Sequence, residues 1–283
     1  MPFLLARGAD NLPAEVQRWQ YFLLRQGFPQ VGRIDASFGM KTELATRFFQ
    51  TKAGLATSGA LDIATIQAAA SLGYTIVPDN YYAVRAGAAW PPKPAGISSP
   101  SNAWRNATFT CFLFRQVPRA ARPDAEAIVI TESCDGTQPD WTNANIVDLA
   151  VPQMKFAASY PGRLPCHKLA APKIKALFEA WEAADLLHLI LLDDGGFEPR
   201  YKRNKSPGDA AQPIRKSSAT TDLSNHAFGS AFDMNYEQNQ FPAVPAFCGQ
   251  KGSTRELAEV AGRLDFYWGG YFDDGNHFEL AKI

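Results

Sequence analysis

Two histidines and two aspartates stand in settings that suit metal-assisted hydrolysis. His226 is followed by small residues that alternate with larger ones up to Asp233, and His277 follows a tight turn at 274–276. Two neutral imidazoles and a carboxylate form a three-ligand set for zinc, and a catalytic zinc site keeps a fourth position for water, whose pKa the metal lowers to about 7. A further carboxylate must take the proton from that water and pass it to a leaving amine. Asp274, inside the turn, is the best-placed candidate.

Two strands are expected to position these side chains. In the segment 223–235, alternate residues from Ala227 onward are small or polar and those between them are mostly apolar, which predicts an extended strand with one core face. Glycine in a strand is otherwise unfavourable. The strand face that carries the small residues is therefore expected to let a substrate or metal approach the backbone closely. A second strand directs His277 and Glu279 to one side. Glu279 is either an alternative base or the group that holds His277, and we favour the second role.

Three motifs in a fixed order carry a resemblance to a known family. They are Ser224-x-His226-x-x-Gly229-x-Ala231-x-Asp233, then Trp268-Gly269-Gly270, then Asp274-x-x-His277-Phe278-Glu279. Over roughly residues 140–283 the chain resembles the D-alanyl-D-alanine carboxypeptidase and L-alanyl-D-glutamate endopeptidase family of zinc peptidases. Members of that family cut the peptide stems of peptidoglycan and are common in bacteriophage endolysins.

The resemblance implies a role for each matching residue. The family's zinc ligands correspond to His226, Asp233 and His277. Asp274 matches the general base. An arginine after a strand and a Gly-rich turn helps to stabilise the oxyanion, and Arg200 fits this place, with Arg203 as the second choice. Ser224 matches the position that supports the substrate or the first ligand. Trp268 reads as core or groove wall, and we assign it to substrate binding.

Residues 12–77 read as a small unit of three helices. Apolar residues at helical spacing end at Gly27, a second helix begins near Lys41, and Asp62 is placed to cap the third. The unit resembles the three-helix peptidoglycan-binding module of many cell-wall hydrolases, through Val16-Gln17-Arg18-Trp19-Gln20, Gly27-Phe28, Gly32-x-x-Asp35-x-x-Phe38-Gly39-x-x-Thr42, Phe49-Gln50 and Gly54-Leu55-x-x-x-Gly59. Where the family usually has Asp-Gly this chain has Asp35-Ala36, which would alter the turn beside the binding groove. The alternative is a purely structural or spacer role.

A Pro- and Ser-rich linker separates this unit from a mixed segment. We expect short strands over 108–114, 127–131 and 146–151, a helix from Pro172 to about Leu187, and a buried strand over 188–192 that ends at 193–196. These elements predict an α+β zinc peptidase domain, with an antiparallel sheet and flanking helices, joined to a small all-α N-terminal domain. The expected boundaries are 1–77 for the helical module, 78–105 for the linker and 106–283 for the metallopeptidase domain. An insertion from Asn204 to Thr221 departs from the family pattern and would reshape the substrate groove on that side.

Composition and charge exclude several classes. The 283 residues carry 28 basic and 28 acidic side chains, so the formal net charge is zero and a principal nucleic-acid partner is not expected. No apolar run approaches the roughly 20 residues that cross a bilayer, and the first residues lack the pattern of a secretory signal peptide. The four cysteines are scattered without a Cys-x-x-Cys pair, which leaves buried free thiols or one disulfide. His167 and His188 read as structural.

We therefore expect a zinc-dependent peptidoglycan peptidase of the endolysin type, a monomer that binds Zn²⁺ and bacterial peptidoglycan, without a nucleic-acid partner or membrane insertion. Made in the cytoplasm without a signal peptide, it would act at the cell wall after holin-dependent release from a phage-infected cell or, second, delivery by a contractile injection system. Two alternatives stay open: a non-catalytic wall-binding or phage structural protein that retains the peptidase fold, and a different metal-dependent amidase or muramyl hydrolase. The sequence leaves open whether the L-Ala–D-Glu or the D-Ala–D-Ala bond is cut.

Overall fold

The computed structural model describes residues 4–117, 127–206 and 213–283. Its N-terminal part is built from α1 (Pro13–Arg25), α2 (Met40–Lys52) and α3 (Ile63–Ala70). These helices enclose Trp19, whose ring lies 5.5 Å from that of Phe49 and 5.4 Å from that of Tyr74 between centroids. Asp62 caps α3 by accepting a hydrogen bond from the Thr65 backbone N–H at 2.8 Å. The expected small all-α unit is confirmed.

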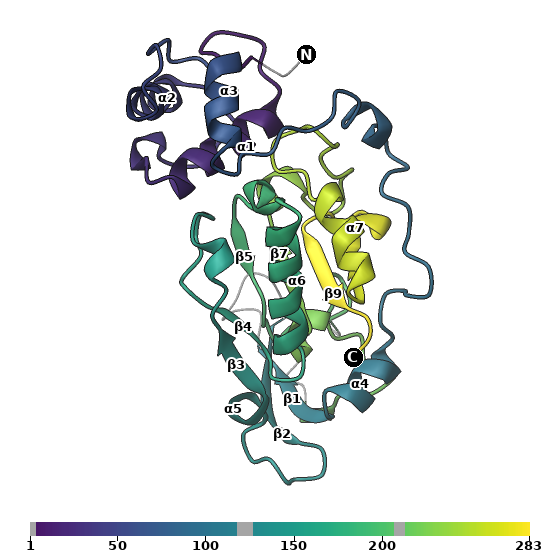
Figure 1. The fold of residues 1–283 in the computed structure, drawn as a ribbon. Helices are drawn as coiled ribbons and strands as arrows, with labels where there is room; N and C mark the ends of the chain where they lie inside the picture. Colours follow the sequence, from purple (N-terminus) through teal and green to yellow (C-terminus); the bar gives the residue numbers. More distant parts are fainter. Residues whose placement is uncertain (1–3, 118–126, 207–212) are drawn as a thin grey trace.

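A four-stranded antiparallel sheet, in the order β5-β7-β9-β8, lies at the centre of the C-terminal part. Its strands are β5 (Asp193–Gly195), β7 (Ala231–Met234), β8 (Phe266–Trp268) and β9 (His277–Leu280). Helices α6 (Ala171–Ala183) and α7 (Arg255–Arg263) cover one face (Figure 1), where the Trp181 ring lies 5.4 Å from that of Phe278. The register pairs Asp233 with His277. Since neighbours in a strand alternate between faces, these two side chains lie together on the other face.

Two smaller antiparallel sheets complete the C-terminal part. They are built from β1 (Phe112–Gln116), β2 (Ile128–Ser133) and β6 (Arg215–Lys216), and from β3 (Ile146–Leu149) and β4 (Leu164–His167). Shorter helices lie at Pro29–Val31 (η1), Ala83–Arg85 (η2), Asn102–Thr108 (α4), Trp141–Asn145 (α5), Pro152–Met154 (η4) and Tyr236–Gln238 (η7). The architecture confirms an α+β domain with antiparallel sheets and flanking helices.

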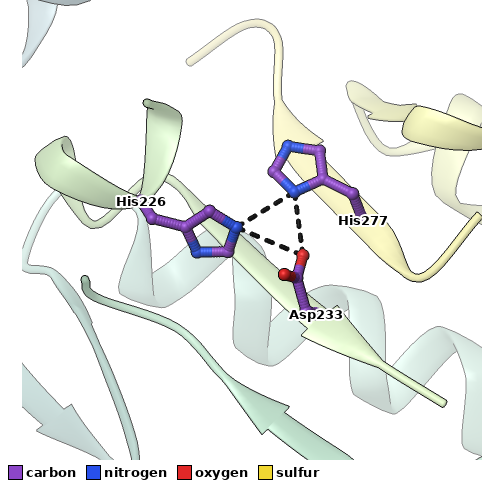
Figure 2. A group of neighbouring side chains, drawn as sticks. All are labelled: His226, Asp233 and His277. Atoms are coloured by element: carbon purple, nitrogen blue, oxygen red, sulfur yellow. Dashed lines mark hydrogen bonds and ion pairs between the residues drawn. The ribbon is translucent and has the colours of Figure 1, made fainter. Parts of the chain in front are cut away.

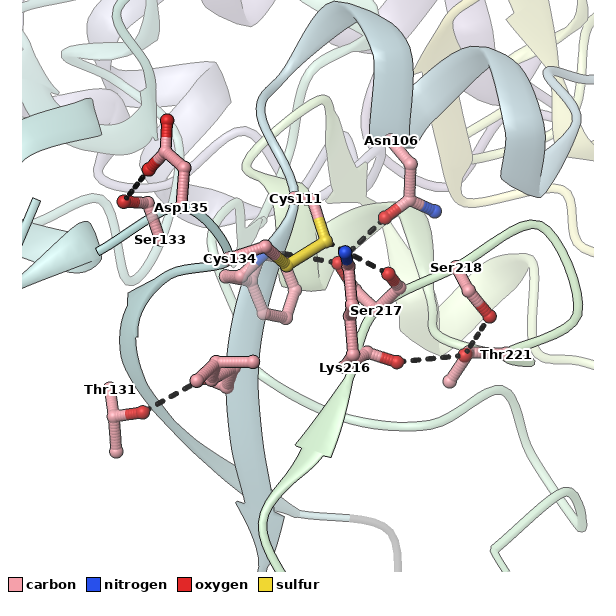
Figure 3. Close-up of a disulfide and its surroundings, with 12 residues drawn as sticks. Asn106, Cys111, Thr131, Ser133, Cys134, Asp135, Lys216, Ser217, Ser218 and Thr221 are labelled. Carbon is pink, nitrogen blue, oxygen red and sulfur yellow. Dashed lines mark hydrogen bonds between the residues drawn. A yellow bond between two sulfur atoms is a disulfide. The ribbon is translucent and has the colours of Figure 1, made fainter. Parts of the chain in front are cut away.

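A disulfide joins Cys111 to Cys134, at the end of the β1–β2 hairpin (Figure 3), whereas Cys166 and Cys248 are free. The hairpin also holds the second half of the expected insertion, because β6 pairs with β1. Residues 207–212 of that insertion lie outside the described residues. Of the two cysteine states that the sequence left open, the structure has the one with a single disulfide.

The segment 223–235 is not one continuous strand, contrary to the expectation from its alternating pattern. Residues Asn225–Phe228 form a 3-10 helix, η6, before β7 begins. Ser224 caps η6 by accepting a backbone hydrogen bond at 3.3 Å, and Gly229 ends it in the left-handed conformation with φ +65°. A Cβ at Gly229 would lie 2.6 Å from the backbone nitrogen of His167, so glycine is required. Some of the small residues that predicted an open strand face, Ala227 and Gly229, instead form η6 and the turn that ends it.

The strand expected over 188–192 is also wrong. Residues Leu187–Leu189 form a 3-10 helix, η5, and β5 begins only after Leu192. The side chain of Asn235 explains the difference: its Oδ1 accepts hydrogen bonds from the backbone N–H groups of Leu191 at 2.8 Å and Leu192 at 3.1 Å. One amide thus satisfies donors that a neighbouring strand would otherwise have to satisfy.

The segment 78–105 runs along the C-terminal part (Figure 1) and is bonded to it. Arg255 in α7 donates hydrogen bonds to three backbone carbonyls of this segment, those of Gly87, Ala88 and Trp90. The Tyr271 hydroxyl donates to the carbonyl of Pro92 at 3.0 Å. The composition that predicts a linker therefore describes a segment without regular structure over most of its length, not one without contacts.

The N-terminal helices contact the C-terminal part through α1. Arg18 forms an ion pair with Asp185 at 2.9 Å. Gln17 is fully buried, donates to the carbonyl of His188 at 3.1 Å and accepts from the Gly252 N–H at 3.2 Å. Because an amide buried in this way satisfies polar groups on the other part, the contact has a defined geometry.

Candidate metal centre

Three side chains converge where η6, β7 and β9 meet (Figure 2). His226 Nε2 lies 3.1 Å from His277 Nδ1 and 3.2 Å from Asp233 Oδ1, and the last two atoms are 2.8 Å apart. Both imidazoles are buried and Asp233 is half-buried. Over residues 4–117, 127–206 and 213–283, no other group of three or more His, Cys, Asp or Glu side chains brings ligand atoms together in this way. The structure thus unites the three residues that the sequence singled out.

The outer ring nitrogens fix the tautomers of both imidazoles. His226 Nδ1 lies 2.6 Å from the carbonyl oxygen of Gly196, so Nδ1 carries the proton and Nε2 presents its lone pair to the centre. His277 Nε2 lies 3.1 Å from Glu279 Oε2 and donates to that carboxylate, which leaves Nδ1 for a metal. Metal-binding histidines are commonly held by a carbonyl or a carboxylate in this manner. Glu279 therefore lies where a group that supports His277 belongs.

Charges within the cluster favour a cation between the three inner donor atoms. Burial alone would raise the pKa of Asp233, but the two imidazoles hold it well below its usual range. Burial alone would lower the pKa of His277, whereas the hydrogen bonds and charges of Asp233 and Glu279 raise it to about 10. Two carboxylates thus make the centre strongly attractive to positive charge.

The donor set fits a zinc ion. Zinc binds nitrogen and oxygen ligands at about 2.0–2.2 Å in tetrahedral geometry, which separates neighbouring ligand atoms by about 3.3–3.6 Å. The observed separations, from 2.8 to 3.2 Å, are shorter, so the three side chains need only move apart by a few tenths of an ångström to hold the ion. An ion would take the place of the protons that link the donors here. Three protein ligands also leave the open fourth position that a catalytic site requires.

Asp274 lies in the turn before β9, beside the three ligands. Its backbone N–H donates to the carbonyl of Gly269 at 3.0 Å, and its own carbonyl accepts from the His277 N–H at 3.1 Å. Its carboxyl Oδ1 is buried and has no hydrogen-bond partner among the residues that the structure describes. Burial raises the pKa of Asp274 and the charge of Asp233 adds to this, although His277 and Arg203 oppose it. A free carboxyl oxygen with a raised pKa beside a metal site suits a general base.

Trp268 supports this turn from within the core. It is 2% exposed, and its indole Nε1 donates to the carbonyl of Gly275 at 2.8 Å. A Cβ at Gly270 would come within 2.2 Å of the indole ring, so the neighbouring glycine is required. Little of the ring is left to meet a substrate, contrary to the substrate-binding role expected from the sequence. Trp268 instead positions the turn that carries Asp274.

The two candidate arginines lie in different surroundings. Arg200 Nε forms an ion pair with Glu198 at 2.9 Å. Arg203 is exposed, its guanidinium lies 5.2 Å from the ring centroid of Phe241, and its charge helps to lower the pKa of Asp274. Arg203, the second choice from the sequence, is therefore the arginine whose charge acts on the candidate base.

A cavity of about 280 Å³ opens beside His277 and Glu279. Its other lining residues are Ser99, Pro100, Lys202, Ser224, Asn225 and Phe272. Sequence reasoning included Ser224 but missed the rest. Asn225 could have been found, because it lies inside the Ser-x-His motif. The residues from the expected linker carried no signal, since only the folded chain brings them to the site.

Comparison with protein families gives two matches. Residues 13–69 match a family described as peptidoglycan binding domain, and residues 217–280 match a family of peptidases described as D-alanyl-D-alanine carboxypeptidase. Neither the curated proteins nor the solved structures include a significant match to the chain. The first matched segment contains α1, α2 and nearly all of α3, and the second contains all three residues of the candidate metal centre. The modular resemblance seen in the sequence is confirmed, and it supports a hydrolase that acts on peptidoglycan at the cell wall.

Proposed function

We propose that this protein is a zinc-dependent peptidase that hydrolyses the stem peptides of peptidoglycan. One observation carries the proposal: His226 Nε2, Asp233 Oδ1 and His277 Nδ1 lie within 3.2 Å of one another, in the segment that matches the carboxypeptidase family. The outer nitrogens of both histidines are held by protein oxygens, so the inner nitrogens are oriented toward a common ion.

The residues of the centre would divide the chemistry between them. The three ligands hold the ion, and a bound zinc ion supplies Lewis acidity toward water and the scissile carbonyl. Asp274 accepts the proton of the attacking water on its free Oδ1 and delivers it to the leaving amine. Arg200 or Arg203 would donate hydrogen bonds to the carbonyl oxygen as negative charge develops on it, and we favour Arg203 because its charge also acts on Asp274. Ser224 caps η6 and thereby supports the first ligand, His226.

The whole chain would work as a wall-bound enzyme. We propose a peptidoglycan-binding module over 1–77, a linker over 78–105 and a metallopeptidase domain over 106–283, acting as a monomer. No helix in the described part of the chain is long and apolar enough to cross a membrane. Release through a phage holin is the proposed route from the cytoplasm to the wall.

Purified protein incubated with bacterial cell walls tests the proposal. We expect new free amino groups without new reducing sugars, loss of this activity after treatment with a chelator, and its return with Zn²⁺. His226→Ala should lose both zinc and hydrolysis, whereas Asp274→Ala should keep zinc and lose at least about 100-fold in kcat. His188→Gln, which changes a buried histidine outside the cluster, is the control and should keep zinc. Full activity of metal-depleted protein would refute the proposal.

The bond that is cut can be identified from the products. Mass spectrometry of digested muropeptides would show release of free D-Ala for a carboxypeptidase. A new amino terminus at D-Glu would instead identify an L-alanyl-D-glutamate endopeptidase. We leave both bonds within the proposal, because the geometry of the ligands is the same for either.

A non-catalytic wall-binding protein is the alternative function. It would sediment with cell walls yet release no new amino or carboxyl termini. The complete set of ligands argues against it, because a centre without chemistry has no need of three oriented donors and a neighbouring carboxyl group with a free oxygen.

A further inference from the structure

A buried arginine lies on the Glu279 side of the metal centre. Arg105, in α4, is fully buried, although it falls outside both matched segments and at the end of the expected linker. Its guanidinium carbon lies 5.4 Å from the ring centroid of Phe228, in η6. Its Nη2 donates to Asn102 Oδ1 in the same helix. Burying a guanidinium costs free energy unless it is hydrogen-bonded, so its other hydrogen-bond partner indicates its role.

That partner is an amide that connects Arg105 to Glu279. Arg105 Nη1 donates to Asn225 Oδ1 at 2.5 Å, and Asn225 Nδ2 donates to Glu279 Oε2. A guanidinium only donates hydrogen bonds and an ionised carboxylate only accepts them. The Asn225 amide therefore has one orientation that satisfies both neighbours, and Arg105 selects it.

Glu279 has few other contacts that could hold it in place. It is 1% exposed, its Oε2 contacts His277 Nε2 at 3.1 Å, and its Oε1 has no hydrogen-bond partner within the described parts of the chain. If the Asn225 amide turned, its oxygen would face the carboxylate and Glu279 would move. Burial lowers the pKa of Arg105 to about 10 while the charge of Glu279 opposes this, so Arg105 remains a cation at neutral pH.

We infer that Arg105 is a positioning residue of the metal centre, which acts through Asn225 and Glu279 to hold the His277 imidazole with Nδ1 toward the ion. The inference rests on the proposed function for the identity of the site as a metal centre. If Arg105 has this role, the last residue of the expected linker helps to position a ligand of the centre. Removal of Arg105 should therefore weaken metal binding as well as hydrolysis.

The affinity of the full-length protein for Zn²⁺, measured by competition with a chromophoric chelator, tests the inference. Arg105→Met should weaken zinc binding about tenfold, the lower end of the roughly 10–100-fold range for partners that touch a metal-binding histidine directly. Arg105→Lys keeps the charge and a donor, and should recover part of the loss. The visible absorption of the Co²⁺-loaded protein should change in Arg105→Met, because it reports the ligand geometry itself.

Two further variants separate positioning from general stability. Arg18→Met removes a guanidinium of similar burial, 5% exposed, whose ion pairs go to Glu15 and Asp185 and not to any residue of the centre. It should lower the free energy of unfolding and leave the Kd for zinc unchanged. The double variant Arg105→Met/Glu279→Gln should bind zinc no more weakly than Glu279→Gln alone, because both changes break one chain of contacts.

The possible results are distinct. A Kd for Arg105→Met within about twofold of the wild type, together with a lower unfolding free energy, would make Arg105 merely structural and overturn the inference, as would additive losses in the double variant. If the wild-type protein binds no zinc, the proposed function fails instead. If Arg105→Met does not fold, Arg105→Gln carries the same test, since its neutral amide lacks the charge and the forked donors of arginine.

Discussion

Protonation of His167 should make the fold sensitive to mild acid. His167, at the end of β4, is 1% exposed, its ring lies 4.9 Å from that of Phe109, and its Nδ1 accepts a hydrogen bond from the Leu169 N–H at 3.1 Å. A proton on Nδ1 would remove that acceptor and place a charge in a buried site. Burial, with a smaller effect from the charge of Lys168, therefore lowers the pKa of His167 to about 4.

The size of the effect follows from the two protonation equilibria. His167 takes up a proton near pH 6.5 when unfolded but only near pH 4 when folded, so between these values the unfolded chain binds more protons and stability rises with pH. The stability that neutral, buried His167 contributes is fully present above pH 6.5. Between pH 6.5 and about 4 it falls by roughly 1.4 kcal/mol per pH unit. The total loss is about 3 kcal/mol. The loosening would reach the metal centre, because the His167 backbone N–H donates to the carbonyl of Gly229, directly after η6, at 2.8 Å.

Urea unfolding with a chelator present, over about pH 4.5 to 7, measures this contribution. His167→Asn is the matched variant, because its Oδ1 can accept from the Leu169 N–H but takes up no proton. The smaller side chain lowers stability by an amount independent of pH, so the relevant quantity is the difference between the two proteins at each pH. We expect that difference to change by about 2–3 kcal/mol across the range, in favour of the variant in acid. A difference that stays constant within about 0.5 kcal/mol would refute the reasoning.

Three further predictions concern separate parts of the chain. Reduction of the disulfide between Cys111 and Cys134, 23 positions apart, should lower the free energy of unfolding by about 2–4 kcal/mol in denaturant titrations, and a change below about 0.5 kcal/mol would contradict it. Asp62→Ala removes the cap of α3 and should cost about 1 kcal/mol in the same assay, with Asp62→Asn close to the wild type. Arg203→Met should reduce kcat on cell walls by about 100-fold or more, whereas Arg200→Met should change it much less; the reverse order would return the oxyanion role to Arg200.

That His226, Asp233 and His277 lie together could be predicted, because each of their signals is local. His226 and Asp233 stand in one short motif, and His277 follows a turn whose residue types are typical of tight turns. Zinc in proteins is bound almost entirely by Cys, His, Asp and Glu, so the few residues of these types in the two motifs are the candidate ligands. The N-terminal helices could be predicted for the same reason, since apolar spacing and the Asp62 cap are read within a few residues.

The conformation around the centre could not be predicted because it depends on contacts between distant segments. Small residues in 223–235 are consistent with an open strand face or with a tight turn, and the choice is made by the backbone of His167, which leaves no room for a side chain at Gly229. The segment 188–192 presents the same difficulty. Its apolar run suits a strand, but the Asn235 amide satisfies its backbone and allows a 3-10 helix there instead.

Arg105 shows most clearly why a linker cannot be defined by composition alone. Proline and serine over 78–105 indicate that regular structure is disfavoured, and most of the segment indeed has none. They carry no information about what the segment touches. Its carbonyls accept hydrogen bonds from Arg255, its last residue reaches the metal centre through Asn225, and each partner lies more than a hundred positions away. Lengthening this segment would therefore do more than extend the reach of the N-terminal module, because it would also disturb contacts that hold the centre.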